Sequence, residues 1–266
     1  MIVADDNPQA GAVARIVLRR LALKATGLTG ADVERLVREA RHKARRSRRD
    51  LTFSDLFDIL LMAKPERPQA LRWRMALHES GHAVARLALG LGRITAISID
   101  SPDGGYTEGE TPAMETETEA FFAGMLIVNL AGRAAEDELL GSVTAGSGGS
   151  PDSDLAKATV LAQAMETTLG FATEWPLLYR PASERSAFIS DSAQLGKRVN
   201  ARLEEAYVKA RKLIRRNRGA AHVLAEALIR HETLEGEELE AALSAVRDRM
   251  VGTEVGGDST GEDGPQ

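Results

Sequence analysis

The stretch "ALHESGHAV", residues 76–84, constrains this chain most, because it pairs two histidines with a glutamate at helical spacing. Each residue of an α-helix advances about 100°, so His78 and His82 lie about 40° apart on one face and one turn apart. Two imidazoles placed in this way can bind one metal ion. Glu79 lies about 60° from His82, where its carboxylate can reach a metal-bound water without binding the metal. The stretch therefore predicts a catalytic zinc site with Glu79 as its general base.

A catalytic zinc site needs a third protein ligand, and the rest of the sequence limits the choice. The chain has no cysteine, so thiolate ligands, disulfides and cysteine nucleophiles are excluded. The longer form H-E-x-x-H-x-x-G-x-x-H is absent, because Ala85 and Ala88 stand where it requires Gly and His. The other histidines belong to separate predicted helices and are expected to be solvated or capping residues; they are His42, His222 and His231. Carboxylates are better candidates, namely Glu136, Asp152 and Asp154.

Asp154 begins a predicted helix, where the positive end of the helix dipole keeps a carboxylate ionised and ready to bind metal. An acidic residue at this position also stabilises a helix without any metal. The residues alone therefore leave the third ligand open between Asp154, Asp152 and Glu136.

The pattern of apolar residues and caps predicts a mainly α fold. Aromatic residues make up only 4% of the 266 residues, whereas Ala and Leu are frequent. Two short segments differ: "RITAISID" is β-branched and predicts a strand, and "YTEGE" after a glycine turn predicts a second strand or an edge segment. The remaining periodic segments predict helices over residues 29–48, 50–64, 70–90, 114–141 (as one helix or two), 154–170 and 191–217, with two more around Val223 and Leu239. We thus expect a small β-sheet or hairpin beside the H-E-x-x-H helix.

The sequence divides into two predicted domains and a tail. Two prolines in "KPERPQ" break the helical pattern and predict a domain boundary. The last fifteen residues lack apolar anchors and predict a disordered tail. We therefore expect a first domain of residues 1–64, a second of residues 65–251, and a tail of residues 252–266.

Charge and hydropathy argue against nucleic-acid and membrane partners. The net charge is −5, and the basic stretch at residues 41–50 lacks the interleaved aromatic residues that stack on bases. The N-terminus lacks the pattern of a signal peptide. The most apolar run, residues 121–132, is shorter than the roughly 20 residues that a membrane helix needs. We expect neither a nucleic-acid site nor a membrane segment in this chain.

Several segments, in one order, resemble the FtsH-type membrane-bound AAA+ zinc metalloproteases. "ALHESGHAVA" is similar to that family's metal-binding helix, "GGYT" to the segment after its short strand, and "LAGRAAEDELLG" to its next helix. "DLAKATVLAQAMETTLGF" resembles the helix that carries the third ligand, and "PLLYR" the loop after it. "TGLTGADVERLVREARHKARRSRRDLTFSDL" resembles the end of the AAA+ lid subdomain. The resemblance spans roughly residues 20–250 and is specific because separate motifs agree.

The resemblance implies roles for particular residues. It makes residues 1–64 an AAA+ lid remnant and residues 65–251 the zinc peptidase domain. The zinc ligands it implies are His78, His82 and Asp154, with Glu79 as the base; Glu136 then packs beside the ligands. It also favours substrate binding through the edge of residues 104–108, that is, Gly105, Tyr106 and Thr107, over a strand that only packs on the zinc helix.

The activity implied is that of a zinc metalloendopeptidase, a hydrolase that cleaves unfolded or loosely folded proteins and peptides. For the full-length context the resemblance implies a homo-hexamer at the cytoplasmic face of the bacterial inner membrane, anchored by an N-terminal segment that this sequence lacks. The sequence contains no G-x-x-x-x-G-K-[ST], so we expect a fragment or a short relative without an ATPase motor, cleaving without ATP. The alternative is a non-catalytic assembly or scaffold module of a AAA+ protease complex, against which the intact Glu79 argues.

Overall fold

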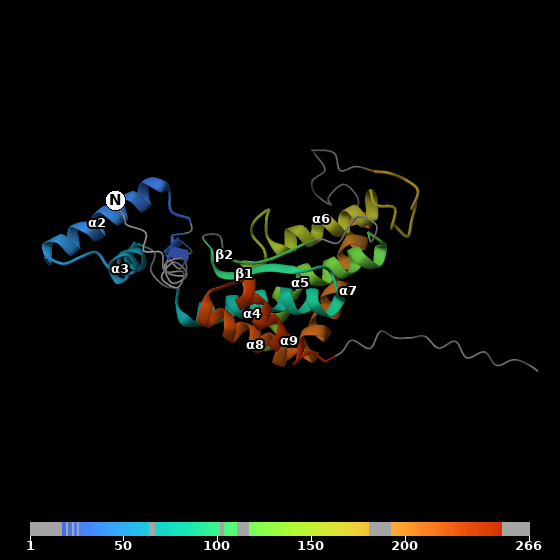
Figure 1. Ribbon diagram of the computed structural model, residues 1–266. Coiled ribbons are helices and arrows are strands. Elements are labelled where there is room, and N and C mark those ends of the chain that lie inside the picture. The colour runs from blue at the N-terminus through green and yellow to red at the C-terminus, as the bar shows by residue number, and fades with distance from the viewer. Residues whose placement is uncertain are drawn as a thin grey trace, which may run out of the picture.

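The computed structural model describes residues 18–251, except for residues 20, 23, 26, 64–66, 102–103, 111–116 and 181–192. The tail of residues 252–266 and the boundary predicted between residues 64 and 65 lie outside the described residues. The described residues form a mainly helical molecule with one small sheet (Figure 1), which confirms the predicted fold class.

The order of elements matches the helices predicted from the sequence, and residues 119–140 form one helix, not two. The elements are α2 (Gly30–Arg46), α3 (Phe53–Ala63), α4 (Gln69–Leu89), β1 (Ile94–Ser101), β2 (Gly104–Gly109), α5 (Glu119–Leu140), the 3-10 turn η2 (Ala145–Ser147), α6 (Asp154–Thr167), α7 (Ala193–Arg216), α8 (Arg218–His231), β3 (Thr233–Glu235) and α9 (Gly236–Arg247). None of the described helices is both long and apolar enough to cross a membrane.

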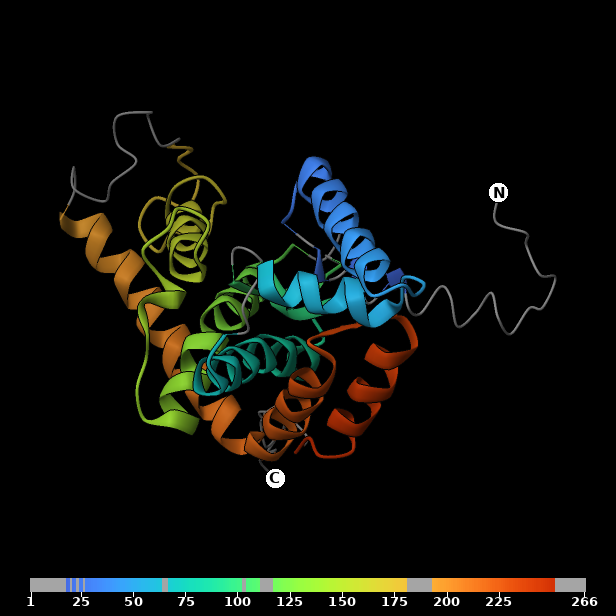
Figure 2. The ribbon, with the colours of Figure 1, turned by 90° about the vertical axis from the view of Figure 1, so that its left-hand side faces the viewer.

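Helices α2 and α3 form a small unit at one end of the molecule, and they cross each other in the side view of Figure 2. The start of α2 is fixed by a capping box, in which Thr29 and Asp32 each bond the other's backbone N–H. This unit has its own apolar core, which contains Leu36, Ala40, Ile59 and Leu60. The N-terminal helices therefore do not rely on the main core for their packing.

Helix α4 lies at the centre of the larger unit, and every residue from Ala76 to Arg86 is buried. It packs against α5 and α8 and against strands β1 and β2. The contact with α5 is so close that a Cβ at Gly81 would lie 2.5 Å from the carbonyl oxygen of Ala131. The glycine inside this apolar helix thus has a packing reason, because any side chain would push the two helices apart.

The sheet is antiparallel, with strand order β2-β1-β3, and it lies beside α4. Ile97 of β1 stands opposite Thr107 of β2 and Leu234 of β3. Strand β2 is therefore an edge strand, and its outer side has no strand partner among the described residues. The sequence analysis missed β3, because three residues between two helices are too few to show an alternating pattern.

Helix α6 is tied to α7 by a buried carboxylate. Glu166 is only 2% exposed and accepts hydrogen bonds from Arg198 Nε at 3.0 Å and from Arg202 Nε at 2.6 Å. Arg202 also donates to the carbonyl oxygen of Phe171, just after α6. These ion pairs add to the apolar contacts of α6, whose buried residues Ala158, Ala162 and Met165 belong to the main core, and they hold its C-terminal end against α7.

We predict that Glu166→Gln lowers the free energy of unfolding by about 3 kcal/mol, because it breaks two ion pairs at a buried group. The matched control is Glu205→Gln, which removes an exposed pair with Lys209 one turn away on α7 and should cost about 0.5 kcal/mol or less. Denaturant unfolding of both variants measures the difference. Equal losses would show that the Glu166 network does not hold α6.

Candidate metal centre

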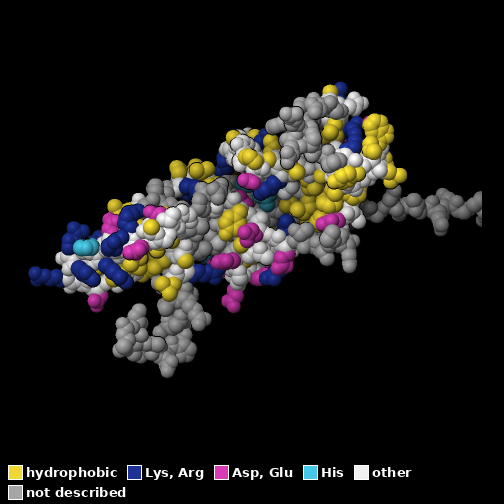
Figure 3. All heavy atoms as spheres, turned by 90° about the horizontal axis from the view of Figure 1, so that it is seen from above, with side chains coloured by type: hydrophobic (Ala, Val, Ile, Leu, Met, Phe, Trp, Pro, Cys, Tyr) yellow, Lys and Arg dark blue, Asp and Glu magenta, His cyan; other side chains and the backbone are white. Residues whose placement is uncertain are grey.

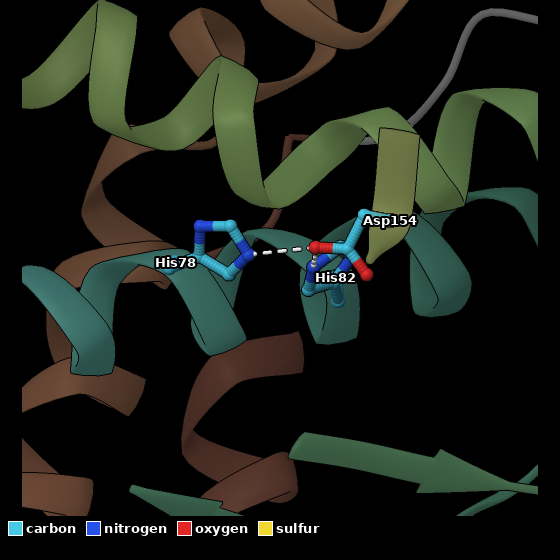
Figure 4. A group of neighbouring side chains, drawn as sticks. All are labelled: His78, His82 and Asp154. Carbon is cyan, nitrogen blue, oxygen red and sulfur yellow. Dashed lines mark hydrogen bonds and ion pairs between the residues drawn. The ribbon is translucent and has the colours of Figure 1, made fainter. Parts of the chain in front are cut away.

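Helices α4 and α6 bring two imidazoles and one carboxylate together. His78 Nε2 and His82 Nε2 lie 3.0 and 3.2 Å from the same oxygen, Oδ2 of Asp154. The three ligand atoms lie within 4.8 Å of one another, and Figure 4 shows the side chains pointing toward one another. Asp154 is the first residue of α6, held there by the N-cap Ser153, whose side chain accepts a hydrogen bond from Ala156 N. Its carboxylate thus enters the cluster from the positive end of a helix.

The Nδ1 atoms of both imidazoles, which point away from Asp154, already have hydrogen-bond partners. His82 Nδ1 lies 2.8 Å from the carbonyl oxygen of Val128, and His78 Nδ1 lies 2.9 Å from Oε1 of Glu136. A carbonyl and a carboxylate oxygen only accept hydrogen bonds, so each Nδ1 carries the hydrogen and donates it. The lone pairs are then left on the two Nε2 atoms, which face Asp154.

Three electron-pair donors therefore meet at one point and need a positive charge between them. When no metal is bound, a proton on His78 Nε2 can supply this charge: burial lowers the pKa of His78, but hydrogen bonds to Asp154 and Glu136 outweigh it and raise the pKa to about 10. Burial raises the pKa of Asp154, but the two nearby imidazoles outweigh it and hold this pKa well below its usual range. Two imidazole nitrogens and one carboxylate oxygen form a ligand set that fits zinc and leaves a fourth position open.

Glu136, which the sequence also offered as a ligand, supports His78 instead. Its carboxylate is 2% exposed and accepts hydrogen bonds from Arg74 Nη1 at 2.7 Å and from the backbone N–H of Thr144 at 3.0 Å. Burial raises the pKa of Glu136, but the bonds to His78 and Arg74 outweigh it and lower the pKa to about 2. The third carboxylate candidate, Asp152, is exposed and stands outside the cluster.

Glu79 lies on the same helical turn as the ligands but outside their cluster. Its carboxylate is 5% exposed, and Oε2 accepts a hydrogen bond of 2.9 Å from Thr107 Oγ1. Gly105 covers the other oxygen so closely that a Cβ there would lie 2.3 Å from Oε1. Burial raises the pKa of Glu79 above its ordinary value, which makes this carboxylate a stronger base.

A cavity of about 910 Å³ opens beside these groups. It is lined by the three candidate ligands, by Glu79 and by all three residues that the sequence analysis assigned to substrate, Gly105, Tyr106 and Thr107. Figure 3 shows histidine side chains at the surface in the middle of the molecule, among acidic and basic ones. The remaining histidines lie elsewhere: His42 is on α2, His222 stacks on Trp73, and His231 ends α8.

The sequence analysis missed Arg74, Thr144 and Gly132 as parts of this site. Arg74 and Thr144 reach Glu136 from sequence positions that show no motif. Gly132 lies on α5 against the ligands, where a Cβ would come within 2.4 Å of Nε2 of both His78 and His82. A glycine inside an apolar helix was the available signal, because it often marks a close approach.

We predict that Gly132→Ala weakens metal binding roughly tenfold or more, since the added methyl group displaces both ligating nitrogens. Competition titration with Zn²⁺ and a chromophoric chelator measures the affinity. The control is Gly219→Ala on α8, where a Cβ would meet nothing within 4 Å, so that the affinity should not change. A normal affinity in Gly132→Ala would contradict the location of the site.

Comparison with known proteins agrees with this geometry. The family model for peptidase family M41 matches residues 67–242. The ATP-dependent zinc metalloprotease FtsH 1 of Sorangium cellulosum is 33% identical over 259 residues, which cover 87% of this chain and 41% of that protein. The FtsH protein of Syntrophus aciditrophicus is 34% identical, over 84% of this chain and 33% of its own length. FtsH 3 of Sphaerobacter thermophilus is 33% identical, over 90% of this chain and 50% of its own length.

This chain thus spans between a third and a half of the length of these curated relatives. The family match covers α4, the sheet, α5, α6, α7 and α8, which are the elements that build the cluster and enclose it. It confirms the resemblance to FtsH-type peptidase domains. The chain belongs to peptidase family M41.

Proposed function

We propose that this chain is a zinc-dependent endopeptidase that cleaves unfolded or loosely folded proteins. One observation carries the proposal: two Nε2 lone pairs and one carboxylate oxygen converge, while Glu79 lies one residue along the helix, outside that cluster. The names of the relatives, which are zinc metalloproteases, support zinc as the metal. In this proposal the ligands are His78, His82 and Asp154.

A bound zinc supplies Lewis-acid chemistry at this point, polarising the scissile carbonyl and activating water. Glu79 is the group that moves the proton: its carboxylate takes a proton from the attacking water and later gives it to the leaving amine nitrogen. Thr107 holds one oxygen of that carboxylate through a 2.9 Å hydrogen bond, which fixes the orientation of the carboxylate. Burial raises the pKa of Glu79, which favours holding the proton between the two steps. No side chain forms a covalent intermediate in this route.

The edge strand β2 is proposed to hold the substrate. Its outer side has no strand partner among the described residues, so an extended peptide can pair with its backbone. Backbone pairing positions a carbonyl without requiring a particular sequence, which suits loosely folded substrates. Gly105 and Thr107 also pack on Glu79, so the strand supports the base as well as the peptide.

The domain division and the assembly are proposed on the family resemblance. The separate core of α2 and α3 and the start of the family match at residue 67 support a lid remnant in residues 1–64 and a peptidase domain in residues 65–251. The homo-hexamer and the cytoplasmic face of the bacterial inner membrane are proposals for the full-length context only. Because the sequence contains no phosphate-binding loop, cleavage by this chain alone is proposed to proceed without ATP.

The rival proposal, a non-catalytic scaffold, makes no use of Glu79. A buried carboxylate costs free energy unless it is compensated, yet Glu79 is retained under β2 with its pKa raised. This arrangement favours the enzyme.

We predict that Glu79→Gln still binds zinc but loses casein cleavage by roughly 100-fold or more, because the ligands remain while the base is lost. Zinc content and cleavage are measured in one preparation, with and without a chelator. The control Glu226→Gln removes an exposed charge on α8 and should keep full activity.

A chelator should abolish cleavage by the unmodified chain, and a tightly folded protein should survive with or without ATP. Near-normal turnover by Glu79→Gln would refute its role as the base. A zinc-loaded chain that cleaves neither casein nor peptides would favour the scaffold.

A further inference from the structure

Arg86 is a buried cation on the helix that carries the proposed zinc ligands. It lies one turn after His82 on α4, is 8% exposed, and lines the same cavity as Glu79. Its Nη1 donates to the carbonyl oxygens of Leu91 at 2.7 Å and Glu110 at 3.2 Å. These bonds anchor one corner of the guanidinium against the loop after α4 and the end of β2.

No described carboxylate balances the charge of Arg86. Other partly buried arginines each form an ion pair with a buried glutamate; they are Arg74, Arg198 and Arg202. Arg86 has no ion pair in the described part of the chain, and burial lowers its pKa. A cation that is buried without a counter-ion is costly, so its charge is available to an anion that enters the cavity.

The guanidinium also has unused donors. Nε and Nη2 of Arg86 have no hydrogen-bond partner among the described residues, yet they are not sealed from solvent. Among the described residues, the only buried side-chain nitrogen or oxygen that has neither solvent contact nor a hydrogen-bond partner is Nε of Arg180. Arg86 lines the cavity, and its two unpaired donors, Nε and Nη2, lie on one edge of the guanidinium in the fork geometry that matches a carboxylate.

Arg86 lies at a defined distance from the proposed base. Strand β2 runs in the same direction as α4, since Thr107 contacts Glu79 and Glu110, just after the strand, contacts Arg86. Arg86 follows Glu79 by seven helical steps, a rise of roughly 10 Å. An extended peptide advances about 3.3 Å per residue, so the same length holds about three residues.

A second polar group lines the same cavity, from α5. Asn129 interrupts the apolar run of α5, and its side-chain amide has no hydrogen-bond partner among the described residues. It follows Val128, whose carbonyl accepts the hydrogen of His82 Nδ1. Its amide adds a neutral donor to the cavity lining.

We propose that Arg86 forms a subsite for a substrate carboxylate located about three residues from the bond that is cleaved. The carboxylate is either an acidic side chain or the free C-terminus of the substrate. This proposal rests on the proposed peptidase function and adds a preference that backbone pairing along β2 does not supply. Nη1 of Arg86 keeps its structural bonds, while Nε and Nη2 bind the carboxylate.

The test uses the zinc-loaded full chain and quenched fluorescent peptides of one sequence. Glu, Gln or Lys is placed in turn at each position two to four residues on either side of the cleaved bond. A second set ends at these positions with a free carboxylate or an amide. We expect, at one position, kcat/KM about tenfold higher for Glu than for Gln, or for the free than for the amidated end. Lys should be cleaved more slowly than Gln there.

Variants then tie the preference to Arg86. Arg86→Gln should bring the ratio of kcat/KM for Glu over Gln peptides, and for free over amidated ends, close to one. Arg86→Lys should retain part of this preference. The control Arg93→Gln removes a charge from the surface beside the same loop, outside the cavity lining, and should leave the ratio unchanged. If Arg86→Gln fails to fold, the kcat/KM ratios of the unmodified chain still test whether the subsite exists. Ratios within twofold of one at every position, in both peptide sets, would overturn the proposal.

Binding separates this proposal from the proposed function. Zinc-loaded Glu79→Gln binds the same peptides without cleaving them, and fluorescence anisotropy gives their affinities. A Glu over Gln preference in binding, with no cleavage by the unmodified chain, would refute the peptidase and support the subsite. Equal affinities alongside efficient cleavage would refute the subsite alone.

Discussion

The close contact between α4 and α5 is the constraint on which the site depends. Gly81 and Gly132 leave no room for a Cβ between the two helices. At this separation α5 offers a backbone carbonyl to His82 and a carboxylate to His78. Both imidazoles are then fixed with the hydrogen on Nδ1 and the lone pair on Nε2. A wider contact would free the rings to rotate and would disperse the ligand atoms.

Three carboxylates within one site take different roles because their surroundings differ. Glu136 is buried, but hydrogen bonds from His78, Arg74 and Thr144 outweigh burial, so its pKa falls to about 2 and it stays ionised behind His78. Asp154 faces two imidazoles at a helix N-terminus, which hold its pKa low. Glu79 is enclosed under β2, and burial raises its pKa. Separated environments of this kind fit the proposed roles of ligand, support and base without any change of residue type.

The part of the site that follows from local geometry was predictable from the sequence. The spacing of His78, Glu79 and His82 on one helix is fixed by the helical repeat, and the structure keeps it. The choice between Asp154 and Glu136 was not predictable from the residues alone, because both follow the motif at helical positions. It depends on how the segment between α5 and α6 folds back, with Thr144 bonding Glu136 and Ser153 starting α6. Likewise β3 and Arg74 act through contacts far apart in the sequence.

X-ray absorption at the zinc edge tests the central claim most directly, because it reports the ligand atoms themselves. The account predicts two imidazole nitrogens at about 2.0–2.1 Å and one carboxylate oxygen at about 2.0–2.2 Å in the zinc-loaded chain. Asp154→Ala should lose the carboxylate contribution and bind zinc more weakly, whereas the neighbouring Asp152→Ala should give the spectrum of the unmodified chain. A spectrum unchanged by Asp154→Ala, or one altered by Asp152→Ala instead, would contradict the account.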